Sequence, residues 1–316
     1  LWANAPSLPE LNYENPAVCD YIYGGPDSVI RSYLRMGIDG WRLDTAFELG
    51  YHHLDALTRS AHAEKPGSLV VGEIWNYPAD WFPAVDAVMN FTARQIILDS
   101  LSGRIDPALA GSMLTKMIAD AGIEPILKSW LVLDNHDTPR LGHVLPDPRD
   151  QKLAQVLQFT LPGAPNLYYG SELGMDGGSD PANRAPMRWD LVSDDNPVYR
   201  WMKQLLELRQ RERALKIGDF RQVLAGKLLA FERCTERVDE TVVVVVNPGE
   251  SAVSENILVP DSRLMNYTRM LNLLEPEMSC LIYSGLLEVS LPAKSCLVLK
   301  PHTAAHDGYT PFKRID

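Results

Sequence analysis

The chain has 316 residues, of which 46% are hydrophobic and 22% are charged, a composition that fits a globular protein of about two domains. Forty-one acidic residues outnumber thirty basic ones and give a net charge of −11, and the basic residues form no stripe. This balance argues against a nucleic acid or an anionic membrane as partner and favours a neutral substrate.

Up to about residue 217 the chain alternates helix-like and strand-like segments. Apolar residues recur at helical spacing in residues 25–37, and a short strand follows at 38–44. The same patterns predict further helices at 50–66, 106–122, 147–163 and 196–215. They predict further strands at 68–75, 84–91, 129–137 and 164–172. Strands that alternate with helices of this length imply right-handed crossovers and a parallel sheet.

The alternation of predicted helices and strands ends at about residue 217. β-rich segments separated by turn residues follow, and we expect a small antiparallel β domain over residues 218–300. Within it, the sequence TVVVVVN at 241–247 reads as a central strand that is buried on both faces. The tail at 302–316 has no clear pattern. We therefore predict two domains, residues 1–217 and residues 218–316.

Charged side chains close three of the predicted parallel strands, and the carboxyl ends of such strands commonly line active sites. The first strand ends in Arg42 and Asp44, which share one face because strand side chains alternate with period two. A cation beside Asp44 would keep it ionised, as a nucleophile requires. Glu73 closes the second strand, where partial burial beside other carboxylates would keep a proton on it. The third strand ends in LDNHD, residues 133–137.

Each motif also has a plainer interpretation. Arg-x-Asp on a strand can be a structural ion pair, and a lone Glu after an apolar run can cap a helix. DNHD could bind a metal, since Asp and His are both ligands, but its spacing is loose and the four cysteines lack C-x-x-C spacing. We therefore expect no metal site in this chain. Together, three carboxylate-bearing strand ends match retaining glycoside hydrolysis, which needs a carboxylate nucleophile, a carboxylic acid and charge that stabilises an oxocarbenium-like transition state.

The motifs resemble those of the α-amylase family of glycoside hydrolases. GIDGWRLD, VVGEIW and LVLDNHD, in this order and at these spacings, look like the second, third and fourth conserved regions of that family. Residues 166–190 resemble its stretch around the eighth barrel strand, in the form typical of cyclomaltodextrinases, neopullulanases and maltogenic amylases. The resemblance implies an α/β fold, a (β/α)8 TIM barrel of which this chain supplies only strands four to eight, followed by a C-terminal antiparallel β-sandwich domain.

The resemblance also assigns catalytic roles. Asp44 would be the nucleophile, Glu73 the general acid/base and Asp137 the stabiliser of the transition state. Arg42 and His136 would hold the sugar and the nucleophile. The predicted catalytic residues are therefore Asp44, Glu73 and Asp137, and Arg42 and His136 are predicted to bind substrate.

Further residues are expected to bind substrate. Trp75 is a candidate sugar platform, because a pyranose presents an apolar face to a flat ring; Trp81 is a second candidate, with core packing as its alternative. Asp180 and Arg184 look like family contacts to the nonreducing side of the substrate. Phe47 stands where many cyclomaltodextrinase-type relatives have Asn, which bears on the acceptor-side preference.

We therefore expect a retaining hydrolase that cleaves α-glucosidic bonds in maltodextrin-, cyclodextrin- or starch-type glucans through a covalent glycosyl-enzyme. The alternatives are a transglycosylase or isomerase of the same family that acts on α-glucosides, or a noncatalytic fragment. No cofactor should be required, although the first three strands, which this chain does not supply, could contribute a calcium site.

The expected partners are an α-glucan oligosaccharide and a separate N-terminal polypeptide of the same enzyme. The second follows because five parallel strands cannot close a barrel. A homodimer is left open. We expect a cytoplasmic or periplasmic location, with the cytoplasm slightly favoured.

Overall fold

The computed structural model describes residues 5–304 and 308–309. Most of the tail at 302–316 therefore lies outside the described residues. The chain divides into two compact units, residues 1–89 and residues 90–316. This division differs from the boundary after residue 217, which rests on a change in secondary structure and stays a prediction. Within the described residues, no helix is long and apolar enough to cross a membrane.

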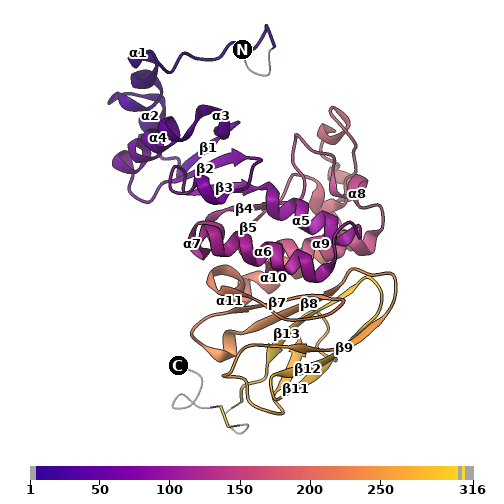
Figure 1. Cartoon of the computed structure of the whole chain (residues 1–316). Coiled ribbons are helices and arrows are strands. Elements are labelled where there is room, and N and C mark those ends of the chain that lie inside the picture. Colours follow the sequence, from indigo (N-terminus) through magenta and orange to yellow (C-terminus); the bar gives the residue numbers. More distant parts are fainter. Residues whose placement is uncertain (1–4, 305–307, 310–316) are drawn as a thin grey trace. The chain divides into compact units, whose positions relative to one another are not determined.

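The first unit combines short parallel strands with helices (Figure 1). Its helices are α1 (Pro16–Cys19), α2 (Val29–Arg35), α3 (Ala46–Leu49) and α4 (Tyr51–Glu64). Its strands are β1 (Gly40–Leu43), β2 (Leu69–Ile74) and β3 (Ala87–Asn90), the last residue of which begins the second unit. The strands follow the order β1-β2-β3, and β1 pairs with β2 in parallel.

The residues of this unit explain its packing. In α4, Leu54, Leu57 and Ala61 fall on one helical face and are buried in a core cluster that also contains Val70 of β2. On β1, Gly40 stands opposite Leu69, and a Cβ added at Gly40 would lie 2.1 Å from the carbonyl oxygen of Leu69. Only glycine allows the two strands to approach this closely at that register.

The second unit begins with a helical layer and two parallel strands. Its helices are α5 (Phe91–Leu101), α6 (Pro107–Ala121), α7 (Ile123–Lys128), α8 (Leu141–Val144), α9 (Pro148–Thr160), α10 (Pro197–Arg211) and α11 (Arg213–Ile217). Strand β4 (Trp130–Val132) pairs in parallel with β5 (Ala164–Asn166). The strands β1 to β5 fall within the five predicted strand ranges.

Three of these helices begin with the same local signal. Asp106, Asp147 and Asn196 precede a proline, and each side-chain oxygen accepts a hydrogen bond from the backbone amide two residues ahead. Proline supplies the fixed φ of the first helical residue without losing an intrahelical hydrogen bond, and the preceding side chain caps the free amides. The sequence therefore fixes the starts of α6, α9 and α10.

Two predictions of extent are wrong. The strand predicted over 129–137 ends at Val132, because the side chains of Asp134 and Asn135 accept hydrogen bonds from nearby backbone amides and turn the chain. The strand predicted over 164–172 ends at Asn166. The helix α5 was not predicted, because apolar residues occupy most of its faces and leave no stripe of helical period.

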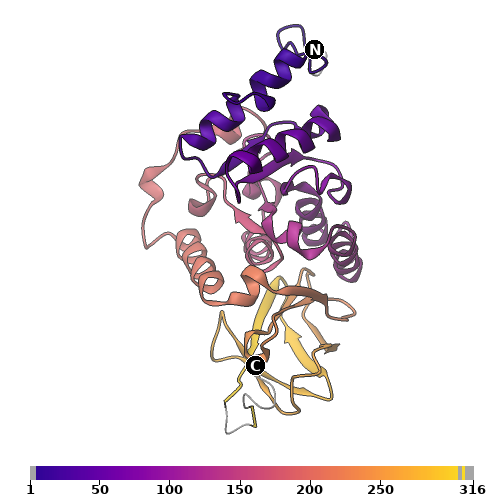
Figure 2. The same cartoon turned by 90° about the vertical axis from the view of Figure 1, so that its left-hand side faces the viewer.

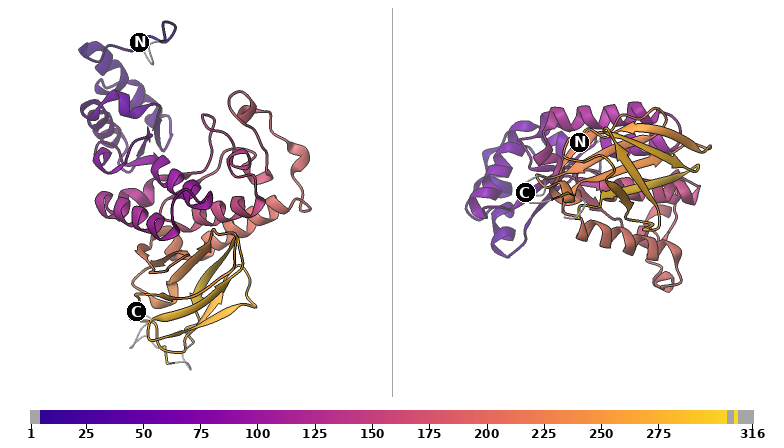
Figure 3. Two further views of the ribbon diagram at one scale, coloured as in Figure 1. Left: turned by 45° about the vertical axis from the view of Figure 1, so that its right-hand side comes forward. Right: turned by 90° about the horizontal axis from the view of Figure 1, so that it is seen from below.

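The remaining strands form an eight-stranded antiparallel arrangement with the order β6-β7-β8-β13-β10-β11-β12-β9. Their bounds are β6 (Asp219–Gln222), β7 (Leu229–Cys234), β8 (Val242–Asn247), β9 (Val253–Leu258), β10 (Arg269–Asn272), β11 (Ser279–Tyr283), β12 (Leu286–Leu291) and β13 (Ser295–Pro301). Figure 2 shows α11 leading from α10 into these strands, and the left view of Figure 3 shows them as an orange and yellow body. Every residue of β8 is buried, as predicted for the valine run.

Candidate active site

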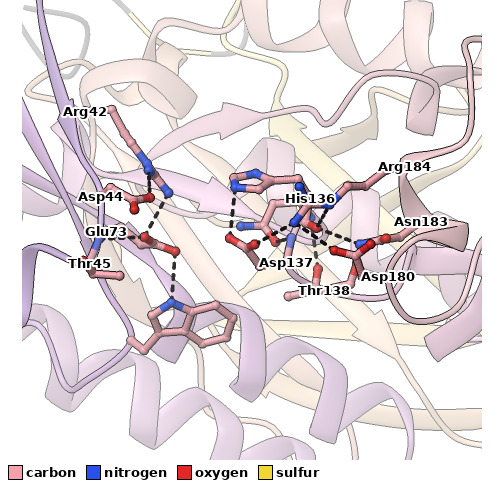
Figure 4. A network of polar contacts seen from close by, with 12 residues as sticks. Arg42, Asp44, Thr45, Glu73, His136, Asp137, Thr138, Asp180, Asn183 and Arg184 are labelled. Atoms are coloured by element: carbon pink, nitrogen blue, oxygen red, sulfur yellow. Dashed lines mark hydrogen bonds and ion pairs between the residues drawn. The ribbon is translucent and has the colours of Figure 1, made fainter. Parts of the chain in front are cut away.

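Polar side chains that follow the parallel strands form two clusters, one in each unit (Figure 4). The Arg42 cluster consists of Arg42, Asp44 and Glu73 and belongs to the first unit. The Asp137 cluster consists of His136, Asp137, Asp180 and Arg184 and belongs to the second. Both clusters contain only residues that the sequence singled out.

One guanidinium holds both carboxylates of the Arg42 cluster. Nη1 of Arg42 contacts Oδ1 of Asp44, and Nη2 lies 2.9 Å from Oε2 of Glu73. The side chain of Asp44 is 74% exposed, whereas that of Glu73 is 4% exposed. Asp44 is therefore open to an incoming ligand, while Glu73 is enclosed and linked to it through one shared cation.

The turn after β1 adds a third group to this cluster. Thr45 has φ +41° and ψ +41°, a left-handed conformation that is rare for a β-branched residue. Its backbone amide donates a hydrogen bond to Oε2 of Glu73 at 2.9 Å. Because strained backbone persists only where its surroundings hold it, this turn fixes an amide against Glu73. Sequence reasoning missed Thr45, whose only signal is its place between the strand end and α3.

Trp75 supplies the remaining contact to Glu73. Its indole Nε1 donates a hydrogen bond to Oε1 of Glu73 at 3.1 Å, while 44% of Trp75 is exposed. The sequence led us to expect carboxylates around Glu73. The contacts to Glu73 come instead from the amide of Thr45, the indole of Trp75 and the guanidinium of Arg42. The nearby carboxylate of Asp44 contacts the same guanidinium.

Asp44 lines a cavity of about 830 Å³ within the first unit. Thr45, Glu48, His53 and residues 10–14 form other parts of its wall. The volume lies in the range of sites that enclose small ligands. A sugar unit placed there can therefore reach the exposed carboxylate of Asp44.

Two aromatic residues near the Arg42 cluster pack against the core of the first unit. Phe47 and Trp81 are partly buried and pack against the core cluster that contains Leu54 and Val70. For Trp81 this agrees with the core-packing alternative. The influence of Phe47 on the acceptor side stays a prediction.

Arg184 organises the Asp137 cluster. Its Nη2 lies 3.3 Å from Oδ1 of Asp137 and 3.2 Å from Oδ2 of Asp180, and Nε2 of His136 lies 3.0 Å from Oδ2 of Asp137. All four side chains are between 36% and 60% exposed. The cluster therefore presents two carboxylates, an imidazole and a guanidinium together at an accessible surface.

Asn183 and Arg184 also form hydrogen bonds with the loop after β4. Asn183 is buried, and its Nδ2 donates hydrogen bonds to the carbonyl oxygens of His136 at 2.8 Å and Thr138 at 3.0 Å. Nε of Arg184 donates to the same carbonyl of His136 at 2.9 Å. Two neighbouring side chains thus fix the backbone that carries Asp137. Sequence reasoning missed Asn183, although it lies beside Arg184 in the family-like stretch.

Asp134 has a different role from its neighbours in the LDNHD motif. Its carboxylate is buried and accepts hydrogen bonds from the amide of Leu141 at 2.9 Å and from Oγ of Ser171 at 3.0 Å. Burial raises the pKa of Asp134, although these hydrogen bonds lower it in part. Asp134 therefore ties the loop to two adjoining segments.

No group of three or more His, Cys, Asp or Glu side chains that could hold a metal ion occurs among residues 5–304 and 308–309. That activity requires no cofactor, and that calcium is possible through the first three barrel strands, stay predictions.

Comparison with known proteins identifies relatives of the chain. Residues 1–218 match the family "Alpha amylase, catalytic domain". The chain is 35% identical over 253 residues to a cyclomaltodextrinase of a Bacillus species, which covers 78% of this chain and 44% of the relative. It is 33% identical over 264 residues to neopullulanase 2 of Thermoactinomyces vulgaris, in an alignment that covers 81% of this chain and 44% of the relative. The chain thus spans less than half the length of these two relatives.

A solved structure supports the fold. A cyclomaltodextrinase structure superimposes with a TM-score of 0.80 at 29% identity, covering 94% of this chain and 51% of that one. The predicted fold class is confirmed: strands of a (β/α)8 barrel are followed by a C-terminal antiparallel β domain.

Proposed function

Because residues 1–218 match the alpha-amylase catalytic domain, the chain belongs to the α-amylase family, and we propose that it is the C-terminal part of a retaining glycoside hydrolase that cleaves α-glucans. The observation that carries the proposal is the shared guanidinium of Arg42, which contacts an exposed carboxylate, Asp44, and a buried one, Glu73. Retaining hydrolysis needs such a pair at short separation, one as nucleophile and one as acid.

In the first step, a carboxylate oxygen of Asp44 attacks the anomeric carbon while Glu73 gives its proton to the departing glycosidic oxygen. The bond to the leaving sugar breaks, and an ester between Asp44 and the sugar forms. The contact with Arg42 orients the Asp44 carboxylate before the attack. The exposure of Asp44 and its place in the cavity wall support this role.

In the second step, Glu73 takes a proton from water as the water oxygen attacks the anomeric carbon. The ester bond breaks and the Asp44 carboxylate is restored. Glu73 must therefore carry the proton in one half of the cycle and lose it in the other. The amide of Thr45 and the indole of Trp75 are fixed donors that hold the ionised form in place.

We propose Asp137 as the residue that stabilises the positive charge of the transition state. Its contacts with His136 and Arg184 support a fixed orientation for the carboxylate. Asp180 and Arg184 are proposed to bind the nonreducing side of the substrate, and Trp75 to offer its exposed ring to a sugar face.

The substrate class is proposed from the relatives. Two of them are named for cyclomaltodextrin and for pullulan cleavage, so maltodextrin-, cyclodextrin- and starch-type glucans are the first substrates to test. Transfer to a sugar hydroxyl, in place of water, is the alternative outcome of the second step. Product analysis with maltotriose at high concentration separates them, because transfer yields products longer than maltotriose and hydrolysis yields none.

Activity is proposed to require barrel strands beyond the five present. Five parallel strands cannot close a barrel, and an open parallel sheet exposes unpaired backbone groups. The proposed partner is an N-terminal polypeptide with the first three strands. We expect hydrolysis of maltotriose when the two are produced together and none by the 316 residues alone; full activity of these residues alone would refute this requirement.

The remaining expectations about the whole protein are proposals of the same kind. A domain boundary after residue 217 is supported by the end of the family match at residue 218 and the start of β6 at Asp219. A cytoplasmic or periplasmic location, with the cytoplasm favoured, stays a prediction, and the homodimer stays an open possibility.

A further inference from the structure

Two tyrosines stand side by side on the outer face of the β domain, on strands that contribute no residue to either polar cluster. Arg269 of β10 pairs with Leu281 of β11. Just before β10, the amide of Tyr267 donates to the carbonyl of Ile282, and the amide of Ile282 donates to the carbonyl of Thr268, so Tyr267 and Thr268 form a bulge opposite Ile282 that brings the Tyr267 ring beside Tyr283 at the end of β11. The ring centroids are 5.2 Å apart and the planes are tilted by 45°. Tyr267 is 69% exposed and Tyr283 is 54% exposed.

The aromatic pair continues into a row that crosses the neighbouring strands. Tyr283 pairs with Leu286 of β12, and Leu286 pairs with Leu258 of β9. Both leucines are exposed. We call Tyr267, Tyr283, Leu286 and Leu258 the tyrosine platform. Because residues directly opposite each other share a face of the sheet, Tyr283, Leu286 and Leu258 form one apolar row, and the ring contact adds Tyr267 to its end.

Polar side chains border the platform on one side. Arg269, Leu281, Glu288 of β12 and Asn256 of β9 form the next row on the same face. All four are exposed, and all except Leu281 are polar. The opposite face of these strands carries buried residues of the β-domain core, among them Met270, Ile282 and Leu287. The rings of the platform are thus directed away from the core, with hydrogen-bonding groups beside them.

The backbone that presents the rings is strained. Tyr267 has φ +66° and Ser284 has φ +50°, a left-handed region in which bulky residues are outliers. The two turns are tied together: the amide of Ser284 donates to Oδ1 of Asn266 at 2.7 Å, and the amide of Tyr267 donates to the carbonyl of Ile282 at 2.7 Å. Glycine would adopt these conformations without strain, so a large exposed ring at Tyr267 needs another reason. Strain of this kind concentrates at functional sites.

We propose that the tyrosine platform binds an α-glucan chain and holds it without cleaving it. The apolar face of a glucose unit would stack on each ring, and sugar hydroxyls would bond to Arg269, Glu288 and Asn256. Two rings tilted by 45° suit a chain that turns from one sugar to the next. The flanking Arg269 and Glu288 balance each other, which fits an uncharged ligand. The choice of an α-glucan rests on the proposed function.

The test uses the 316 residues produced together with the proposed N-terminal polypeptide. It carries Asp44→Asn, which stops turnover, and soluble starch is the probe. Retardation in native gels of increasing starch content gives a dissociation constant. The platform variant combines Tyr267→Gly, which removes the ring and relieves the strained φ, with Tyr283→Ser. Tyr21→Ala is the matched control, because Tyr21 is also 69% exposed but lies in the first unit.

We expect the platform variant to bind starch about tenfold more weakly, which corresponds to about 1.4 kcal/mol, and Tyr21→Ala to bind as the parent does. With Asp44 intact, the platform variant should keep its kcat/KM on maltotriose within about twofold while its kcat/KM on starch falls, because a short substrate occupies the active site alone.

Equal retardation of parent and platform variant, or a parent that starch does not retard, would overturn the proposal. Loss of self-association in the variant with unchanged starch binding would also overturn it and would identify a second copy of the chain as the occupant. Starch binding by an enzyme that hydrolyses no glucan would refute the proposed function and leave the platform in place.

Discussion

Glu73 and Asp134 are both buried carboxylates at the ends of parallel strands, with exposures of 3% and 4%, yet their partners differ. Glu73 is held by the guanidinium of Arg42, the amide of Thr45 and the half-exposed indole of Trp75. Asp134 is held by a serine hydroxyl and a backbone amide of adjoining segments. Burial alone therefore does not separate a reactive carboxylate from a structural one; the partners do.

The comparison predicts opposite consequences of substitution, to be measured on the 316 residues produced together with the proposed N-terminal polypeptide. Changes at Glu73 and at Asp44, which shares its cation, should reduce the rate of hydrolysis and leave the fold intact. Changes at Asp134 should alter the free energy of unfolding and its pH dependence, with little effect on the rate.

The largest effect is expected for Asp44→Asn. An amide cannot form the glycosyl ester, so kcat on maltotriose should fall by at least about 10⁴-fold. The free energy of unfolding should change by less than about 0.5 kcal/mol, because the side chain is 74% exposed. Steady-state kinetics and urea unfolding measure the two. A variant that retains a tenth of the parent rate would contradict the assignment of the nucleophile.

Glu73→Gln should have the next largest effect. Without an acid, kcat/KM on maltotriose should fall by about 10²- to 10⁴-fold. An aryl α-glucoside with a good leaving group needs little protonation, so glycosylation of the enzyme by it should be much less affected. Burst kinetics with the aryl substrate checks this step. Equal and total loss on both substrates would argue against the division of labour between Asp44 and Glu73.

Arg184→Ala extends the comparison to the second cluster. Losing the contacts to Asp137, Asp180 and the carbonyl of His136 should lower kcat/KM on maltotriose by about 10- to 100-fold, the magnitude of one to two hydrogen bonds with a charged group. Arg188→Ala is the matched control, since Arg188 forms an exposed ion pair with Asp190. Equal losses in the two variants would show that Arg184 has no specific role.

Asp134→Asn should have the smallest effect on the rate of hydrolysis, and its main effect should be on the pH dependence of stability. Burial raises the pKa of Asp134, so the folded state binds its proton more tightly than the unfolded state. The stability that this group contributes is present below its unfolded pKa and is lost as the pH rises through its folded pKa. Asn does not titrate, so the variant should gain stability relative to the parent as the pH rises from about 4.

Asp147→Asn is the control of opposite sign for that experiment. Hydrogen bonds from Arg149 lower the pKa of Asp147 to about 2, so the carboxylate contributes stability above its unfolded pKa that is lost as the pH falls. This variant should therefore lose stability relative to the parent as the pH rises. Urea unfolding between pH 4 and pH 8 measures both slopes. The free energy of unfolding of Asp134→Asn, relative to the parent, should rise with pH. If it stays constant or falls, the effect ascribed to burial of Asp134 is contradicted.

The sequence was sufficient for most of the fold because its signals are local. The Asp-Pro and Asn-Pro starts of α6, α9 and α10 and the valine run of β8 were all recognisable. The end of β4 was not, since the side chains of Asp134 and Asn135 in the following loop accept backbone hydrogen bonds and turn the chain.

The sequence predicted only those residues of the candidate site that belong to a recognisable motif. Charged strand ends pointed to Arg42, Asp44 and Glu73, because the carboxyl ends of parallel strands are where such side chains gather. Thr45 was missed, because it acts through its backbone amide in a left-handed turn and its side chain carries no signal. Asn183 was missed because its role depends on a loop 45 residues away in sequence.

The central claim is that Asp44 forms a covalent bond with the substrate. The most direct measurement incubates the active enzyme with a fluorinated α-glucoside whose leaving group is activated, so that the glycosyl-enzyme forms and is hydrolysed slowly, and then maps the adduct by peptide mass spectrometry. The account predicts one added sugar on the peptide that contains Asp44, and none in Asp44→Asn. An adduct on Glu73, or turnover with inversion of the anomeric centre and no adduct, would contradict it.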